Sequence, residues 1–153
     1  MRVSTIIASV LGIGYFPAAS GTVMSIVAVP LAILIARQGG GAAVIVAALL
    51  AFVIGVWACG DHVRATGRED PSECVIDELA GQWLACAGLC FAPASAAEFA
   101  LAFLAFRLFD ILKPWPISAA EKLPGGMGVM ADDMLAGLAA AVIAAAVQYT
   151  RVI

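Results

Sequence analysis

The chain has 153 residues, of which 63% are hydrophobic and only 12% are charged. Soluble domains carry about 25% charged residues, so this composition, with a mean hydropathy of +1.04, predicts an integral membrane protein with a single domain over residues 1–153. A net charge of −3 offers no basic surface and argues against a nucleic-acid partner. The four cysteines contain no CxxC pair, and we expect buried thiols instead of metal ligands.

Residues 1–15 predict a short helix that lies in the membrane interface or re-enters the membrane. Their apolar run is shorter than the roughly 20 residues that a spanning helix needs, and Tyr15-Phe16-Pro17 ends it. A turn with two hydroxyl groups follows, at Ser20 and Thr22. Either hydroxyl can cap the next helix, and Thr22 is also a candidate substrate-binding residue.

Five longer apolar segments follow, most of them near the length of a membrane span of roughly 20 residues. The expected fold is therefore all-α: a polytopic integral membrane bundle of about five membrane helices plus the short N-terminal helix. Pro30 should kink the first of the five. The segments are residues 22–36, 41–60, 74–91, 96–112 and 133–149.

Alternation of these five helices brings most polar residues to one side of the membrane. The N-terminal turn and the loops 61–73 and 113–132 share that side, and most of the lysine and arginine residues lie in them. Only Arg37 and Arg151 lie at the opposite side. The positive-inside rule therefore places the polar side in the cytoplasm.

Local patterns predict how the polar loops meet the helices. Residues 70–73 have the form of a capping box, so the third membrane helix should begin there. Two prolines predict an extended elbow at residues 113–116, and three glycines predict a flexible loop over residues 125–128. Asp132 or Asp133 should then cap the last helix, and this role needs only one of them.

Acidic residues at the ends of membrane helices are the main candidates for function, because burying a charge in a membrane is expensive. A cluster of carboxylates suits Mg²⁺, and neighbouring Lys113 and Arg107 would make the magnesium site a phosphate site. His62, the only histidine, is expected at the surface and not in catalysis. The candidate ligands are Asp77, Glu78, Asp110, Asp132 and Asp133.

Structural roles for the same carboxylates remain open. Asp110 can pair with Arg107 or Lys113, Asp132 can cap a helix, and Glu78 can lie among lipid head groups. A divalent-cation transporter is the alternative outside enzymology, because carboxylates also line ion paths. It would need acidic residues near the middle of the membrane, and residues 138–147 contain no polar residue.

Four motifs, in this order, resemble those of the bacterial phosphatidylglycerophosphatase A family. The last two are long and specific, and together the four span most of the chain. They are Gly14-Tyr-Phe-Pro17 with Gly21-Thr22; Val75-Ile-Asp77-Glu78 with Gly81 and Trp83; Phe106-Arg-x-x-Asp110-x-x-Lys113-Pro-Trp-Pro-Ile117; and Gly125-Gly-Met-Gly128-x-Met130-x-Asp132-Asp133-x-x-Ala136-Gly137.

The resemblance implies a magnesium-dependent phosphatase of the bacterial inner membrane that converts the lipid phosphatidylglycerophosphate to phosphatidylglycerol. It implies that the motif carboxylates hold Mg²⁺ and that Asp77, Asp110, Asp133 and Lys113 are catalytic. Candidate substrate-binding residues are Arg107, Lys113, Thr22 and Gly126. Glu121 stands where the family frequently has aspartate and is left outside this core set. No protein partner is implied.

Phosphate ester hydrolysis needs charge stabilisation on the phosphoryl group and a nucleophile in line with the bond that breaks. Magnesium with Lys113 and Arg107 suits the first task. A water activated by an aspartate suits the second, and an aspartyl-phosphate intermediate stays open. Another lipid head-group enzyme is the second alternative, although the signature of the CDP-alcohol phosphotransferases is absent from the sequence.

Overall fold

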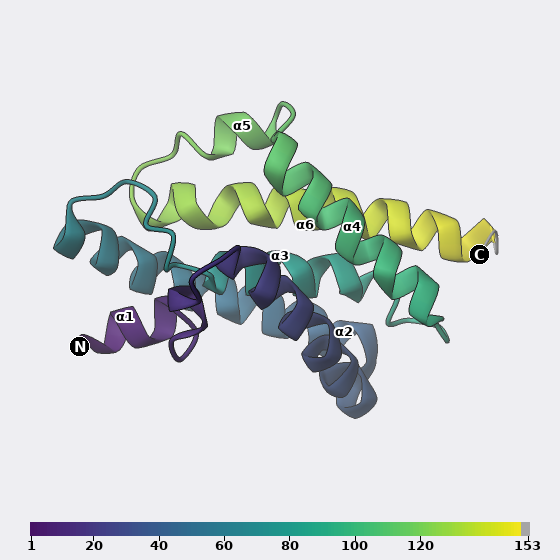
Figure 1. Cartoon of the computed structure of the whole chain (residues 1–153). Helices are drawn as coiled ribbons and strands as arrows, with labels where there is room; N and C mark the ends of the chain where they lie inside the picture. Colours follow the sequence, from purple (N-terminus) through teal and green to yellow (C-terminus); the bar gives the residue numbers. More distant parts are fainter. Residues whose placement is uncertain (151–153) are drawn as a thin grey trace.

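The computed structural model describes residues 1–150. All regular secondary structure in this part of the chain is helical, which confirms the all-α class (Figure 1). Arg151, expected opposite the polar side, lies outside the described residues. The helices in chain order are α1 (Val3–Ala8), the 3-10 helix η1 (Ile13–Tyr15), α2 (Ser20–Thr66), α3 (Ile76–Ala87), α4 (Ala96–Leu112), α5 (Ile117–Ala120) and α6 (Gly126–Thr150).

The first two predicted membrane helices form one broken helix, α2. The break lies at Gly39 and Gly40, where the backbone angles leave the helical region and φ of Gly40 is +65°. Glycine adopts a positive φ without a steric penalty, so the pair provides a point where the chain can turn. Pro30, where a kink was expected, lies inside the helix, and the non-helical angles are at the glycines.

Two of the described helices, α2 and α6, are long and apolar enough to cross a membrane by length and composition. The other two major helices are shorter, with 12 residues in α3 and 17 in α4. At 1.5 Å per residue, α3 covers only about 18 Å of a hydrocarbon layer of about 30 Å. The expected count of about five membrane helices is therefore not established by helix length.

Helix α3 is the centre of the bundle and packs against α2, α4 and α6. Its glycines allow this close packing, because a Cβ at Gly81 would lie 2.6 Å from the carbonyl oxygen of Asp133. A Cβ at Gly88 would lie 2.7 Å from the carbonyl oxygen of Ala141, and one at Gly137 would collide with the carbonyl of Gly81. Helices α3 and α6 therefore cross in near backbone contact and run in the same direction.

Two predicted helix starts are wrong. Helix α3 begins at Ile76, and residues 70–73 form no capping box, because Glu73 instead contacts His62 and Arg68. Helix α6 begins at Gly126, so most of the predicted glycine loop is helical and only Gly125 keeps a positive φ, of +62°.

Two further local expectations are corrected at the same end of the bundle. Asp132 and Asp133 lie beyond the first turn of α6 and cap no helix. The expected extended elbow is a left-handed turn at Lys113, with φ +44° and ψ +57°. Pro114 disfavours right-handed helix at Lys113, as predicted, and the N–H of Lys113 closes α4 on the carbonyl of Phe109 at 2.8 Å.

Replacement of Gly137 tests the α3–α6 crossing. Because an added methyl group would meet the Gly81 backbone, Gly137→Ala should lower the free energy of unfolding by about 1–3 kcal/mol. Thermal unfolding of the purified protein in detergent measures the loss. Leu138→Ala, at the adjacent and half-exposed position, should change the midpoint less, and equal effects would contradict this packing.

Candidate functional site

A cavity of about 860 Å³ opens at the end of the bundle where α2, α3 and α6 begin and α4 ends. The loop before α3 and the segment before α6 complete its walls. Every candidate site residue from the sequence lines this cavity except Gly126: Asp77, Glu78, Asp110, Asp132, Asp133, Arg107, Lys113 and Thr22.

Three of these carboxylates form a tight group in the cavity. One ligand atom from each of Asp77, Glu78 and Asp133 lies within 4.8 Å of the others. The first turn of α3 supplies Asp77 and Glu78, and the glycine crossing brings Asp133 of α6 beside them. Like charges at this separation repel one another unless a cation lies among them.

Unpaired atoms in this group show that it fits a divalent cation. Glu78 Oε2 and Asp133 Oδ2 are buried and have no hydrogen-bond partner among the described residues. Leaving a buried charged acceptor unpaired is costly. Oxygen donors of this kind are the ligands that Mg²⁺ prefers, so Asp77, Glu78 and Asp133 together can hold one such ion.

The remaining two carboxylates have cationic partners. Asp110 forms an ion pair with Arg107, one turn away on α4. Asp132 Oδ2 accepts a hydrogen bond of 2.7 Å from Lys113 Nζ, which also donates to Glu121 Oε1 at 2.9 Å. These pairs place two cations at the edge of the acidic group, where phosphate oxygens can reach them.

Both cations keep capacity for an anionic ligand. Arg107 Nε is buried and has no hydrogen-bond partner within residues 1–150, although the side chain pairs with Asp110 elsewhere. Burial acts to lower the pKa of Lys113, but its bonds to Asp132 and Glu121 outweigh this effect and raise the pKa above its usual value. Lys113 therefore stays charged throughout the physiological pH range.

Gly21 is required for the shape of the cavity wall. A Cβ at Gly21 would overlap Glu78 Oε1, so a larger residue there would require this carboxylate to move. Its neighbour Thr22 lines the cavity, as expected of a substrate-binding residue. Gly126 lies outside the cavity wall and packs against α2, where a Cβ would collide with the carbonyl of Val56.

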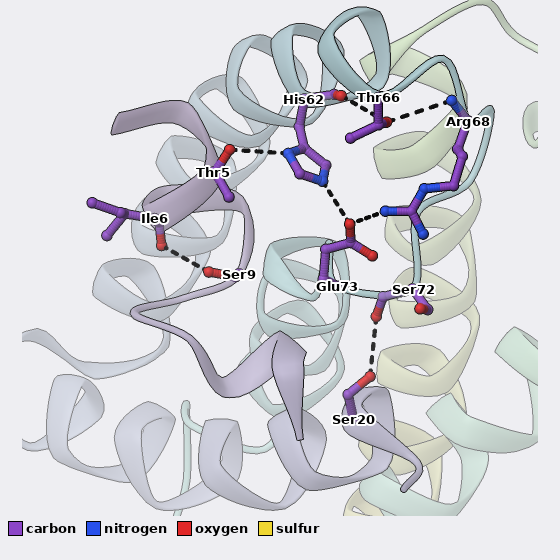
Figure 2. A network of polar contacts seen from close by, with 9 residues as sticks. All are labelled: Thr5, Ile6, Ser9, Ser20, His62, Thr66, Arg68, Ser72 and Glu73. Carbon is purple, nitrogen blue, oxygen red and sulfur yellow. Dashed lines mark hydrogen bonds and ion pairs between the residues drawn. The ribbon is translucent and has the colours of Figure 1, made fainter. Parts of the chain in front are cut away.

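A second polar network holds the loop before α3 in place (Figure 2). His62 Nε2 lies 2.9 Å from Glu73 Oε1, and its Nδ1 lies 3.0 Å from Thr5 Oγ1. Arg68 also pairs with Glu73. The network ties α1, the end of α2 and the loop together, so residues 69–72 of the loop are fixed beside the cavity.

This network corrects the expectation for His62. The side chain is buried, with only 4% of its surface exposed, and its hydrogen bonds lie outside the carboxylate group. Burial acts to raise the pKa of Glu73, but the hydrogen bonds from His62 and Arg68 outweigh it and hold this pKa below its usual value. His62 therefore has a structural role at the end of α2.

The sequence profile of the phosphatidylglycerophosphatase A family matches residues 6–148. The chain belongs to this family. A phosphatidylglycerophosphatase A of Haemophilus influenzae is 34% identical over 140 residues, which cover 90% of this chain and 84% of that protein. The phosphatidylglycerophosphatase A of Escherichia coli K12 is 33% identical over 132 residues, which cover 85% of this chain and 74% of that protein.

A third relative has a different name. A Bacteroides thetaiotaomicron protein, provisionally named a phosphatidylinositol-3-phosphatase, is 39% identical over 87 residues. This match covers 55% of this chain and 52% of that protein. No solved structure matches the chain significantly. The names of all three relatives describe phosphatases of phospholipid head groups.

Sequence reasoning missed two features of this phosphatidylglycerophosphatase A family member. Glu121 contacts Lys113 across the turn between α4 and α5, and no periodic pattern in the sequence joins these positions. Gly21 stood in a recognised motif, but its contact with Glu78 depends on the packing of α2 on α3. The small residues next to Gly21 in this motif were the only feature of the sequence that could have indicated close packing of another helix at this position.

Replacement of Gly21 tests the fit between α2 and Glu78. Gly21→Ala should displace the Glu78 carboxylate. On the sequence-based expectation that Glu78 is a metal ligand, phosphatase turnover should fall by about tenfold or more. The control is Gly88→Ala, which brings a Cβ to 2.7 Å from the carbonyl oxygen of Ala141 at the far end of α3. That variant should lose thermal stability more than turnover, and the reverse order of effects would contradict this role of Gly21.

The network around Glu73 predicts an acid-sensitive loop. Because the pKa of Glu73 in the folded protein lies below its usual value of 4.5, its charged form stabilises the fold above that pH. This contribution disappears as the pH falls through the lower, folded pKa. Thermal midpoints measured from pH 7 to pH 3 should therefore drop more steeply for the wild type than for Glu73→Gln, and parallel curves would count against the network.

Proposed function

We propose that this protein is a magnesium-dependent lipid phosphatase that hydrolyses phosphatidylglycerophosphate to phosphatidylglycerol and phosphate in phospholipid biosynthesis. The observation that carries the proposal is one cavity that combines three convergent carboxylates with Lys113 and Arg107. Membership of the phosphatidylglycerophosphatase A family supports the reaction and the substrate. The named relatives support the same lipid phosphate chemistry.

In this proposal Asp77, Glu78 and Asp133 hold Mg²⁺, and Asp110 and Asp132 lie beside them. The bound ion supplies positive charge that stabilises the transferring phosphoryl group. The unpaired oxygens of Glu78 and Asp133 support this assignment, because they are buried and charged when ionised.

The two cations bind the terminal phosphate of the substrate. Lys113 delivers a compact charge from the end of α4, and Arg107 presents its unpaired Nε–H from inside the cavity. Thr22 lines the same cavity, where its hydroxyl can bind the head group. Asp132 and Asp110 hold the two cations in position through the ion pairs described above.

Hydrolysis then uses a water molecule in line with the ester bond. Its oxygen forms a bond to phosphorus as the bond between phosphorus and the lipid oxygen breaks, and the lipid oxygen takes up a proton. Asp77, Asp110 and Asp133 are the carboxylates within the cavity that can orient the water and accept its proton. Lys113 offsets the charge that develops on the phosphate oxygens.

The substrate also requires a particular placement in the membrane. We assign five spans to the bundle: the two parts of α2 on either side of Gly39-Gly40, then α3, α4 and α6. The directions of these helices support this, because α2, α3 and α6 begin at the cavity and α4 ends there. The lysine and arginine bias then places the site at the cytoplasmic face of the bacterial inner membrane.

Phosphate release from phosphatidylglycerophosphate in detergent micelles tests the function. Purified wild-type protein should release phosphate with Mg²⁺ and lose this activity with EDTA. Asp133→Asn keeps the shape and removes one charge, so it should lower turnover at least about 100-fold while the protein still accumulates. No phosphate release by the wild type with or without Mg²⁺ would refute the proposal.

Replacement of Lys113 tests phosphate binding. Lys113→Ala should raise KM or lower kcat by about tenfold or more, because a charge-assisted bond to the phosphate is lost. Lys113→Arg should restore only part of the activity, since a planar guanidinium has a different geometry. Lys122→Ala, which removes a cation from the rim of the same cavity, shows how much of the effect comes from charge alone.

A further inference from the structure

Two buried polar side chains below the carboxylate group have no part in the function described so far. Ser25 of α2 and Gln82 of α3 are both fully buried, with 0% of their surfaces exposed. Ser25 Oγ and Gln82 Oε1 have no hydrogen-bond partner in the described part of the chain. In an apolar bundle each such atom costs stability, so a fold without a use for them would favour apolar residues there.

Helix packing places these two residues in one layer. Helices α2 and α3 touch at Gly21 and Glu78, and they meet again deeper, where Trp83 Nε1 donates to the Ala28 carbonyl at 3.1 Å. The two helices therefore run in the same direction between these contacts.

Ser25 and Gln82 each lie one helical turn below a member of the upper contact. Residues four apart share a helix face, so Ser25 lies below Gly21, and Gln82 lies below Glu78. Glu78 Oε2 is also buried and has no hydrogen-bond partner among the described residues. Three such atoms thus belong to side chains at the α2–α3 contact.

We propose that Ser25 and Gln82 are positioning residues for Glu78, which they orient through a water bound between α2 and α3. This inference rests on the proposed magnesium site. A buried water typically makes about three hydrogen bonds to polar groups that would otherwise be unpaired, and this interface offers three such atoms. The water donates to the carboxylate of Glu78, which then keeps the orientation that binds the metal.

The role of a positioning residue differs from a structural role in a measurable way. Ser25→Ala and Gln82→Leu should each weaken Mg²⁺ binding about tenfold, measured by the shift of the thermal midpoint with Mg²⁺ concentration. The metal-free midpoint should change little, because the water that loses one partner keeps the other two. The double variant should be scarcely weaker than the stronger single variant, because both residues act through one water.

Gln148→Leu is the matched control for Gln82→Leu. Gln148 is also buried, but its side-chain amide donates to the carbonyls of Leu89 and Pro93 at 3.4 and 3.3 Å. This variant should lose metal-free stability and keep its affinity for Mg²⁺.

The outcomes separate this inference from the proposed function. Wild-type phosphate release and stabilisation by Mg²⁺, with unchanged Mg²⁺ affinity in both Ser25→Ala and Gln82→Leu, would overturn the positioning role alone. A fall in metal-free stability with unchanged affinity would also overturn it and leave a structural role. A wild type that neither releases phosphate nor responds to Mg²⁺ would refute the proposed function and this inference together.

Discussion

The structure depends on the convergence of three carboxylates, the buried Asp77 and Asp133 and the half-buried Glu78, at one end of an apolar helical bundle. Their mutual repulsion and their loss of hydration both oppose folding, so the bundle needs a compensating charge at this point. Lys113 and Arg107 compensate the two neighbouring carboxylates but leave this group unneutralised. In the function proposed here, a divalent cation would supply this charge, and a metal beside two fixed cations would be suited to binding phosphate.

Glycine makes this arrangement possible. The α3–α6 crossing at Gly81 and Gly137 brings Asp133 to the start of α3, and Gly21 allows α2 to reach Glu78. A larger side chain at Gly81 or Gly137 would meet the backbone of the facing helix and separate α3 from α6, whereas one at Gly21 would displace the Glu78 carboxylate. The close crossings therefore serve both the packing of the bundle and the geometry of the site, and stability and activity are linked at these positions.

The sequence predicted which acidic residues lie together better than it predicted the local backbone. Five carboxylates at the ends of apolar segments were expected to share one site, because buried charge is expensive, and all five line the cavity. The starts of α3 and α6 were predicted wrongly. At α3, the capping pattern at residues 70–73 does not form, because Glu73 instead makes a long-range contact with His62. Local propensity does not predict such contacts, because they depend on tertiary packing. The pattern of charged residues likewise did not predict the buried layer at Ser25 and Gln82, because neither side chain is charged.

Electron paramagnetic resonance of Mn²⁺ tests the central claim most directly, because Mn²⁺ accepts the same oxygen ligands as Mg²⁺ and its free signal disappears on binding. Titration of the purified protein should show a bound ion that Mg²⁺ displaces. The bound fraction should fall sharply when Asp77 and Asp133 are both replaced by asparagine in a protein that still folds. Unchanged Mn²⁺ binding in that double variant, or none in the wild type, would contradict a metal site at the α3–α6 crossing.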